Sequence, residues 1–274
     1  MSGSARITTD DGAGLEVRID GPDGAPCVVF SNSVMTDLGI WDRQLAALTD
    51  RFRVLRYDQR GHGGSDVTEG ELTFDRLGAD LLQILDRMEI ARVSFVGLSK
   101  GVPTGLSALS RAPERFEAFV AVDGVARSAP GREAFWAERR ETARARGMAE
   151  IAHQTVPRWM PGAAPGDPAA LRLDAMIAST PVEGFAAATH ALQSYDCSAA
   201  VPLIGCPFLG VFGAEDGAMP DAIPAQFGSL PAPAFAAIPG AGHLPNHQCP
   251  DDFNRTLRAF LDAETTKTYR ETRH

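Results

Sequence analysis

Residues 93–101 constrain the possible fold more than any other stretch, because a short apolar run there leads directly into the pattern G-x-S-x-G. Gly97 and Gly101 stand two positions before and after Ser99, and a helical stretch follows over about residues 100–110. We interpret this as a buried strand, a sharp turn and a helix, in which the glycines let strand and helix approach without Cβ clashes. Such a turn lifts the Ser99 hydroxyl above the end of the strand.

Apolar runs and helical stretches alternate on both sides of this turn. A continuous apolar run, which is typical of a strand covered on both faces, occurs at 27–30, and further strands of the sheet are predicted at 52–57, 119–123, 207–212 and 234–238. A hairpin of two short strands is predicted at 6–9 and 14–19, and helices are predicted at 41–49, 74–89 and 250–262. The alternation predicts an α/β fold with a mostly parallel, doubly wound sheet.

The pattern changes between residues 126 and 196. This segment is rich in Ala and Arg, contains helical stretches broken by prolines, and has no apolar run of the β type. We therefore predict an inserted helical cap over residues 126–196, with the α/β core formed by residues 1–125 and 197–274. The tail from residue 263 is polar and is predicted to fray.

The amino-acid composition limits the kinds of molecule that this protein is expected to bind. A chain of 274 residues with 44% hydrophobic residues suits one large globular domain, and a net charge of -9 argues against nucleic acid or anionic membranes as partners. The N-terminus has no signal-peptide pattern and no apolar stretch could span a bilayer, so a cytoplasmic protein is predicted. The four scattered cysteines are predicted to be reduced thiols. We predict a small-molecule substrate and neither a cofactor nor a metal; nothing in the sequence specifies an oligomeric state.

A serine hydroxyl becomes a good nucleophile when a neighbouring base takes its proton and a carboxylate orients that base. His243 follows the last predicted strand and precedes the last helix, so it can reach over the carboxyl edge of the sheet to Ser99. His247, four residues later, is its nearest rival. We predict Ser99 as nucleophile and His243 as base.

Three carboxylates are candidates to orient His243. Asp216 follows the strand after the cap segment and is preferred, because the chain order serine, acid, histidine is then satisfied. Glu215 is adjacent to Asp216, and Asp123 ends the strand that follows the Ser99 strand. Both remain open as alternatives.

An oxyanion hole needs backbone N–H donors close to the nucleophile. The N–H of Lys100, directly after Ser99, is one expected donor. The second is expected in the loop after the first buried strand and falls near Val34. Because both donors are backbone groups, this role places no constraint on the side chains of Lys100 and Val34.

Three segments together resemble the α/β-hydrolase superfamily: the turn at Ser99, residues 57–65 (YDQRGHGGS) and residues 240–243 (GAGH). Within it, residues 31–42 (SNSVMTDLGIWD) and parts of the cap segment resemble the 3-oxoadipate enol-lactonases. The resemblance implies the α/β-hydrolase fold and the hydrolysis of a small enol-lactone that carries a carboxylate.

Such a substrate would be held by polar and aromatic side chains. Its carboxylate would favour an arginine, for which Arg139, Arg140 and Arg158 are candidates. Trp136 and Trp159 are expected to wall the pocket. The substrate-binding residues predicted are Asn32, Trp136, Arg139 and Trp159.

Lys100 departs from the resemblance, because the lactonases carry an apolar residue at this position. Its side chain could hold an anion, pair with Asp123 or extend to solvent, and we expect it to tune the choice of substrate. It also motivates an alternative chemistry on the same fold: C–C bond hydrolysis or tailoring of a biosynthetic intermediate. A further alternative is a ligand-binding protein without turnover, against which Ser99, Asp216 and His243 together argue.

Overall fold

One eight-stranded sheet runs through the molecule in the order β1-β2-β4-β3-β5-β6-β7-β8. The computed structural model describes residues 3–271. The strands are β1 (Gly3–Thr8), β2 (Gly14–Asp20), β3 (Cys27–Ser31), β4 (Arg53–Tyr57), β5 (Val93–Leu98), β6 (Phe116–Val122), β7 (Phe208–Gly213) and β8 (Ala234–Ile238). The hairpin β1–β2 and the pair β2–β4 are antiparallel, and every other pair is parallel. The predicted α/β class with a mostly parallel sheet is confirmed.

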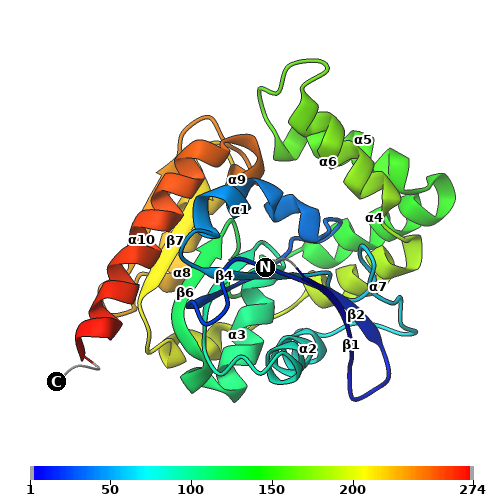
Figure 1. Cartoon of the computed structure of the whole chain (residues 1–274). Helices are drawn as coiled ribbons and strands as arrows, with labels where there is room; N and C mark the ends of the chain where they lie inside the picture. The colour runs from blue at the N-terminus through cyan, green and yellow to red at the C-terminus, as the bar shows by residue number, and fades with distance from the viewer. Residues whose placement is uncertain (1–2, 272–274) are drawn as a thin grey trace.

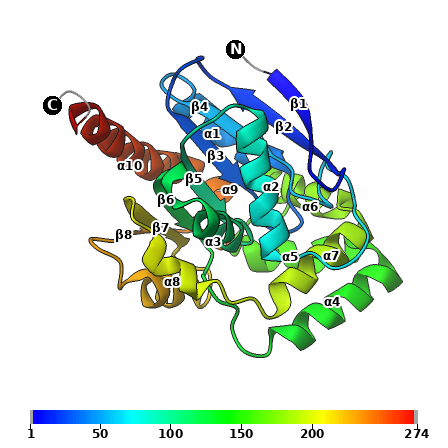
Figure 2. The same cartoon turned by 90° about the horizontal axis from the view of Figure 1, so that it is seen from below.

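Helices cover both faces of this sheet (Figures 1 and 2). They are α1 (Asp42–Leu48), α2 (Phe74–Arg87), α3 (Gly101–Arg111), α4 (Arg132–Arg146), α5 (Met148–Trp159), α6 (Pro168–Ser179), α7 (Val182–Gln193), α8 (Met219–Phe227), α9 (Pro245–Gln248) and α10 (Pro250–Glu271). Short 3-10 helices occupy Leu38–Trp41, Pro113–Arg115 and Ser198–Leu203. No helix among residues 3–271 is long and apolar enough to cross a membrane.

Successive residues of a strand point to opposite faces of the sheet and belong to two hydrophobic clusters, one on each face. In β3, Val28 and Phe30 pack in a cluster with side chains of α1, α10 and α4–α7, whereas Val29 packs with α2, α3 and α8. This period of two places a continuous apolar run in contact with both layers, as expected for a doubly wound sheet.

The helices α4–α7 lie between β6 and β7 in the chain, inside the segment predicted as a cap. Figures 1 and 2 show them grouped together, away from the C-terminal helix α10. The start of α7 meets the loop after β4 backbone to backbone: a Cβ built on Gly184 would lie 2.1 Å from the carbonyl oxygen of Gly61. Only glycine permits this approach.

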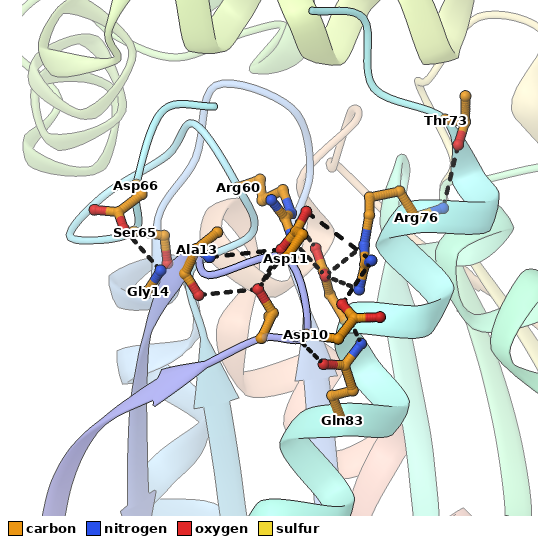
Figure 3. A network of polar contacts seen from close by, with 12 residues as sticks. Asp10, Asp11, Ala13, Gly14, Arg60, Ser65, Asp66, Thr73, Arg76 and Gln83 are labelled. Atoms are coloured by element: carbon orange, nitrogen blue, oxygen red, sulfur yellow. Dashed lines mark hydrogen bonds and ion pairs between the residues drawn. The ribbon is translucent and has the colours of Figure 1, made fainter. Parts of the chain in front are cut away.

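A polar network fixes the hairpin β1–β2 to that same loop and to α2 (Figure 3). Arg60 is buried and donates hydrogen bonds to both carboxylate oxygens of Asp80, at 2.7 and 2.9 Å, and to Asp11 at 2.7 Å. Arg76 bridges Asp80 and Asp10, each at 2.8 Å. The hairpin is therefore held by ion pairs as well as by its strand pairing.

Two sequence predictions need correction. Helix α8 was not predicted, because Pro220 and Pro224 interrupt the usual signal, although Pro220 lies in the first turn, where no N–H partner is lost. The predicted end of the last helix at residue 262 is also wrong, since α10 continues to Glu271. By contrast, Thr73 precedes α2 and its side chain accepts a hydrogen bond from the Arg76 N–H, as an N-cap does.

Candidate active site

Ser99 lies at the sharp turn between β5 and α3, in a left-handed backbone conformation with φ 52°. Both glycines of the motif are required by close contacts. A Cβ on Gly97 would lie 2.7 Å from the carbonyl carbon of Gly101, and one on Gly101 would lie 2.3 Å from the carbonyl oxygen of Ser31. The turn thus has the strained geometry that the sequence pattern predicts.

A chain of two hydrogen bonds connects Ser99, His243 and Asp216. The Ser99 Oγ lies 2.9 Å from Nε2 of His243, and Nδ1 of His243 lies 2.7 Å from Oδ2 of Asp216. His243 belongs to the loop after β8, and its backbone N–H donates to the Trp159 carbonyl at 2.9 Å. The Trp159 ring also packs on the imidazole, with ring centroids 4.8 Å apart. The cap therefore helps to hold the histidine.

The rival residues take other places. His247 is buried, and its Nε2 contacts the carbonyl oxygen of Ala169 at 2.8 Å, so it links α9 to the cap. Glu215 is exposed beside the cavity. Asp123 is buried behind Asp216, where the Gly213 N–H donates to its two carboxyl oxygens at 3.1 and 3.2 Å. Only Asp216 among the three acids is hydrogen-bonded to His243 in the described residues.

The two aspartates differ in charge. Burial raises the pKa of Asp123 well above its ordinary value, and the neighbouring charge of Asp216 raises it further. Burial also acts to raise the pKa of Asp216, but the charge of His243 and hydrogen bonds from His243 and Asp123 outweigh it, so the pKa is lowered. These opposite directions favour the proton on Asp123 and the negative charge on Asp216.

Two backbone donors lie free beside Ser99. In the part of the chain that the structure describes, neither the Val34 N–H nor the Lys100 N–H donates a hydrogen bond within the protein. The loop that carries Val34 is held from both sides by Asn32, whose side chain donates to the Tyr57 carbonyl and accepts from the Trp41 indole, both at 2.9 Å. Both free N–H groups suit an oxyanion hole.

The Lys100 side chain is fully buried and does not line the cavity. Its Nζ has no hydrogen-bond partner among residues 3–271, and burial lowers the lysine pKa to about 7. Its charge acts on His62, whose own pKa is lowered well below the ordinary value by burial and then by Lys100. The expectations that Lys100 extends to solvent or pairs with Asp123 are therefore wrong, and its expected influence on substrate choice has no direct contact to support it.

A cavity of about 610 Å³ opens beside Ser99 and His243, between the core and the cap. The core contributes Val34, Met35, Asp123 and Asp216 to its lining, among others. The cap contributes aromatic and cationic side chains: Arg132, Phe135, Trp136, Arg139, Arg158 and Trp159. One wall is thus positively charged and aromatic.

The positive charge on that wall is concentrated around Phe135. The guanidinium carbons of Arg132, Arg158 and Arg139 lie 4.1, 5.3 and 5.6 Å from the centre of its ring. None of the three forms an ion pair within residues 3–271; the buried Arg139 contacts only neutral partners, Thr155 and Gln154. Burial, and then the two other arginines, lower the pKa of Arg139 to about 10. Such a cluster attracts an anion.

Comparisons with known proteins identify the family of this chain. A model of the alpha/beta hydrolase family matches residues 29–256. The chain is 36% identical over 262 residues to 3-oxoadipate enol-lactonase 1 of Acinetobacter baylyi, a match that spans 94% of this chain and 97% of the relative. The chain belongs to the alpha/beta hydrolase family. Both the predicted family and the predicted fold are thereby confirmed.

Solved structures of alpha/beta hydrolases match over nearly the whole chain. The enol-lactonase from Burkholderia xenovorans has a TM-score of 0.88 at 32% identity, over 94% of this chain and 100% of that one. A thermophilic esterase from Thermogutta terrifontis has a TM-score of 0.88 at 26% identity, over 96% of this chain and 99% of that one.

Three of the four predicted substrate-binding residues of this alpha/beta hydrolase line the cavity: Trp136, Arg139 and Trp159. Asn32 does not, because its amide is used to hold the loop before Val34. Arg140, next to Arg139, points to α7 and donates to Thr189 and Gln193. Sequence reasoning missed Arg132 and Phe135, although their helical spacing to Arg139 was a usable signal.

Asp123, Asp216 and His243 also satisfy one geometric condition for a metal site, since one ligand atom of each lies within 4.8 Å of the others. These atoms already serve other contacts. Nδ1 of His243 is hydrogen-bonded to Asp216, and the Asp123 carboxyl accepts the Gly213 N–H. The arrangement suits proton transfer better than metal coordination, which prefers ionised ligands.

Proposed function

We propose that this alpha/beta hydrolase cleaves a small carboxylic ester or lactone that carries an anionic group, with Ser99 as nucleophile, His243 as base and Asp216 as orienting acid. The observation that carries the proposal is the hydrogen-bonded chain from Ser99 Oγ through His243 to Asp216 at the mouth of a cavity with an arginine wall. The names of the enol-lactonase and esterase relatives support the same reaction class.

In the first half of the reaction, Ser99 Oγ attacks the carbonyl carbon while Nε2 of His243 takes the hydroxyl proton. The negative charge that develops on the carbonyl oxygen is stabilised by the N–H groups of Val34 and Lys100, each worth about 3 kcal/mol by the measured effect of removing such a donor. His243 then returns the proton to the leaving oxygen as its bond to carbon breaks. For an enol-lactone the leaving group is an enolate, which departs readily.

The second half repeats these steps with water. His243 takes a proton from a water molecule as the water oxygen attacks the carbonyl carbon of the Ser99 ester. The tetrahedral intermediate then collapses: the bond from carbon to Ser99 Oγ breaks, His243 returns the proton to Oγ, and the acid is released. Asp216 stays ionised throughout and stabilises the imidazolium form of His243. No redox partner or cofactor is needed for this cycle.

The arginine wall supplies selectivity for an anionic substrate. Arg139 lines the cavity and donates only to the neutral side chains of Gln154 and Thr155, so a carboxylate in the cavity would supply the countercharge that the protein itself does not provide there. Trp136 and Trp159 bound the same space. A 3-oxoadipate enol-lactone, the substrate named for the Acinetobacter relative, has the required size and charge.

Labelling with a fluorophosphonate probe tests the nucleophile. Wild-type protein should be labelled at Ser99, and Ser99→Ala should lose both labelling and hydrolysis of para-nitrophenyl esters. Ser110→Ala, which changes an exposed serine in α3, is the matched control and should behave like wild type. Equal esterase activity in Ser99→Ala would refute the proposed nucleophile.

Matched substrates test the anion site. The para-nitrophenyl monoester of adipic acid and para-nitrophenyl hexanoate have the same chain length and differ in one carboxylate. Arg139→Met should lower kcat/KM for the adipate ester about 10- to 100-fold, the value of a lost hydrogen bond to a charged group, and should affect the hexanoate much less. Arg140→Met, a buried arginine outside the cavity, should not discriminate between the esters. Equal losses for both esters in Arg139→Met would exclude this role.

The competing functions gain less support. C–C bond hydrolysis was motivated by Lys100, whose side chain lies outside the cavity. A protein that only binds its ligand has no need of a serine held by a histidine and an acid at hydrogen-bond distance. Ester hydrolysis is accordingly the function that we propose.

A further inference from the structure

A second carboxyl group lies directly behind the Ser99–His243–Asp216 chain. Asp123 directly follows β6 in a left-handed conformation with φ 40°, and only 1% of its surface is exposed. It is held from two directions: its own N–H donates to the Val211 carbonyl at 2.9 Å, and the Gly213 N–H donates to its carboxyl group. These bonds aim the side chain at Asp216, which follows the neighbouring strand β7.

Two carboxyl groups this close cannot both be charged without a large repulsion, so one of the two is expected to carry a proton. Asp216 faces the imidazole of His243 and keeps its charge, whereas Asp123 has no cationic partner among the described residues. The proton therefore resides on Asp123, which can donate it as a hydrogen bond to Asp216.

We propose that Asp123 is a positioning residue that donates a carboxylic O–H hydrogen bond to Asp216 and so fixes the carboxylate that orients His243. The inference rests on the proposed serine hydrolase function and adds a fourth member to its hydrogen-bonded chain. It has a second consequence: where Asp216 carries no charge, Asp123 can ionise and, after a shift that closes a separation of at most 4.8 Å to hydrogen-bond distance, orient His243 in its place.

Asparagine provides a direct test, since it imitates the protonated acid and not the ionised one. In Asp123→Asn, Oδ1 can accept the Gly213 N–H while Nδ2 donates to Asp216. Asp123→Ala and Asp123→Gly lack the donor, and glycine also tolerates the positive φ, which separates strain from the hydrogen bond. We expect kcat to fall about 10- to 100-fold in both donor-less variants with KM little changed, and Asp123→Asn to recover most of that loss.

The proposed ability of Asp123 to replace Asp216, which we call its reserve role, is tested by removing the carboxylate of Asp216 alone and then those of both residues. Asp216→Asn alone should keep measurable activity, because Asp123 can supply the negative charge. The double variant Asp123→Asn/Asp216→Asn should lose about 10⁴-fold in kcat, the loss typical of an amide in place of the orienting acid. Thermal unfolding of every variant confirms that folded enzymes are compared.

Two outcomes would overturn this inference. One is a kcat of Asp123→Asn as low as that of Asp123→Gly, which would mean that an ionised Asp123 is needed. The other is equal activity of Asp216→Asn and the double variant, which would remove the reserve role. In both cases wild-type labelling and turnover at Ser99 would persist, so failure here is distinct from failure of the proposed function.

Discussion

Replacing Lys100 by methionine should stabilise this protein, and the gain should shrink as the pH rises. The side chain is fully buried without a hydrogen-bond partner for Nζ among the described residues, and burial lowers its pKa from 10.5 to about 7. Between pH 7 and pH 10.5 the unfolded chain holds the Lys100 proton and the native protein releases it. The free energy of unfolding of the wild type therefore rises with pH across this range and has its lower value below pH 7.

The size of the effect follows from the same two pKa values. Each pKa unit corresponds to about 1.4 kcal/mol, so the lowered pKa of Lys100 reduces the free energy of unfolding by about 4 kcal/mol at pH 7 and by about 2 kcal/mol at pH 9. Methionine removes this cost at every pH and keeps the backbone N–H at position 100. The neighbouring His62 titrates well below pH 6.5 and does not contribute to the difference in this range.

Urea unfolding of both proteins at pH 7, 8 and 9 measures the difference in free energy of unfolding. It should fall by about 2 kcal/mol from pH 7 to pH 9. Arg92→Met removes an exposed cation that is ion-paired with Glu117 and serves as the control, whose effect should be independent of pH. A difference between wild type and Lys100→Met that stays constant from pH 7 to pH 9 would refute the buried, ionisable lysine.

Two further predictions concern the scaffold. Gly184→Ala should destabilise the protein by more than about 2 kcal/mol, because its Cβ would collide with backbone of the loop after β4, whereas Gly205→Ala meets no atom within 4 Å and serves as the control in thermal unfolding. Arg60→Met should cost about 3–5 kcal/mol in urea unfolding, since it leaves the Asp80 carboxylate buried with fewer partners; Arg60→Met/Asp80→Leu should regain part of this, and no recovery would contradict the ion-pair explanation.

The parts of the fold that were predictable are those specified by local pattern. The turn at Ser99 needs particular residues at fixed spacing, and buried parallel strands need continuous apolar runs, so both are visible in a few consecutive letters. The absence of further strands between β6 and β7 was predictable for the opposite reason, because that stretch has no such runs. Helix α8 escaped because Pro224 lies within it, a residue that local rules exclude from helix interiors.

The site could be predicted only where chain order constrains it. Ser99, Asp216 and His243 follow a fixed order along the sheet, and the structure brings them to hydrogen-bond distance; their roles stay predictions until the variants are measured. Asp123 lies close to Asp216 because β6 pairs with β7. The two residues are 93 positions apart in the sequence, and no local pattern encodes such a pairing. The burial of Lys100 was not predicted either, because it too is not encoded in any local pattern.

The two hydrogen bonds of Asn32 have a consequence for the energetics of turnover. They fix the loop before Val34 as the protein folds. The conformational entropy of that loop is therefore lost once, on folding, and does not add to the activation free energy of each catalytic cycle. If the Val34 N–H stabilises the oxyanion as proposed, the free enzyme already has the shape that the tetrahedral intermediate requires. A boronic acid that mimics this intermediate should then bind in a single step, without a slow rearrangement.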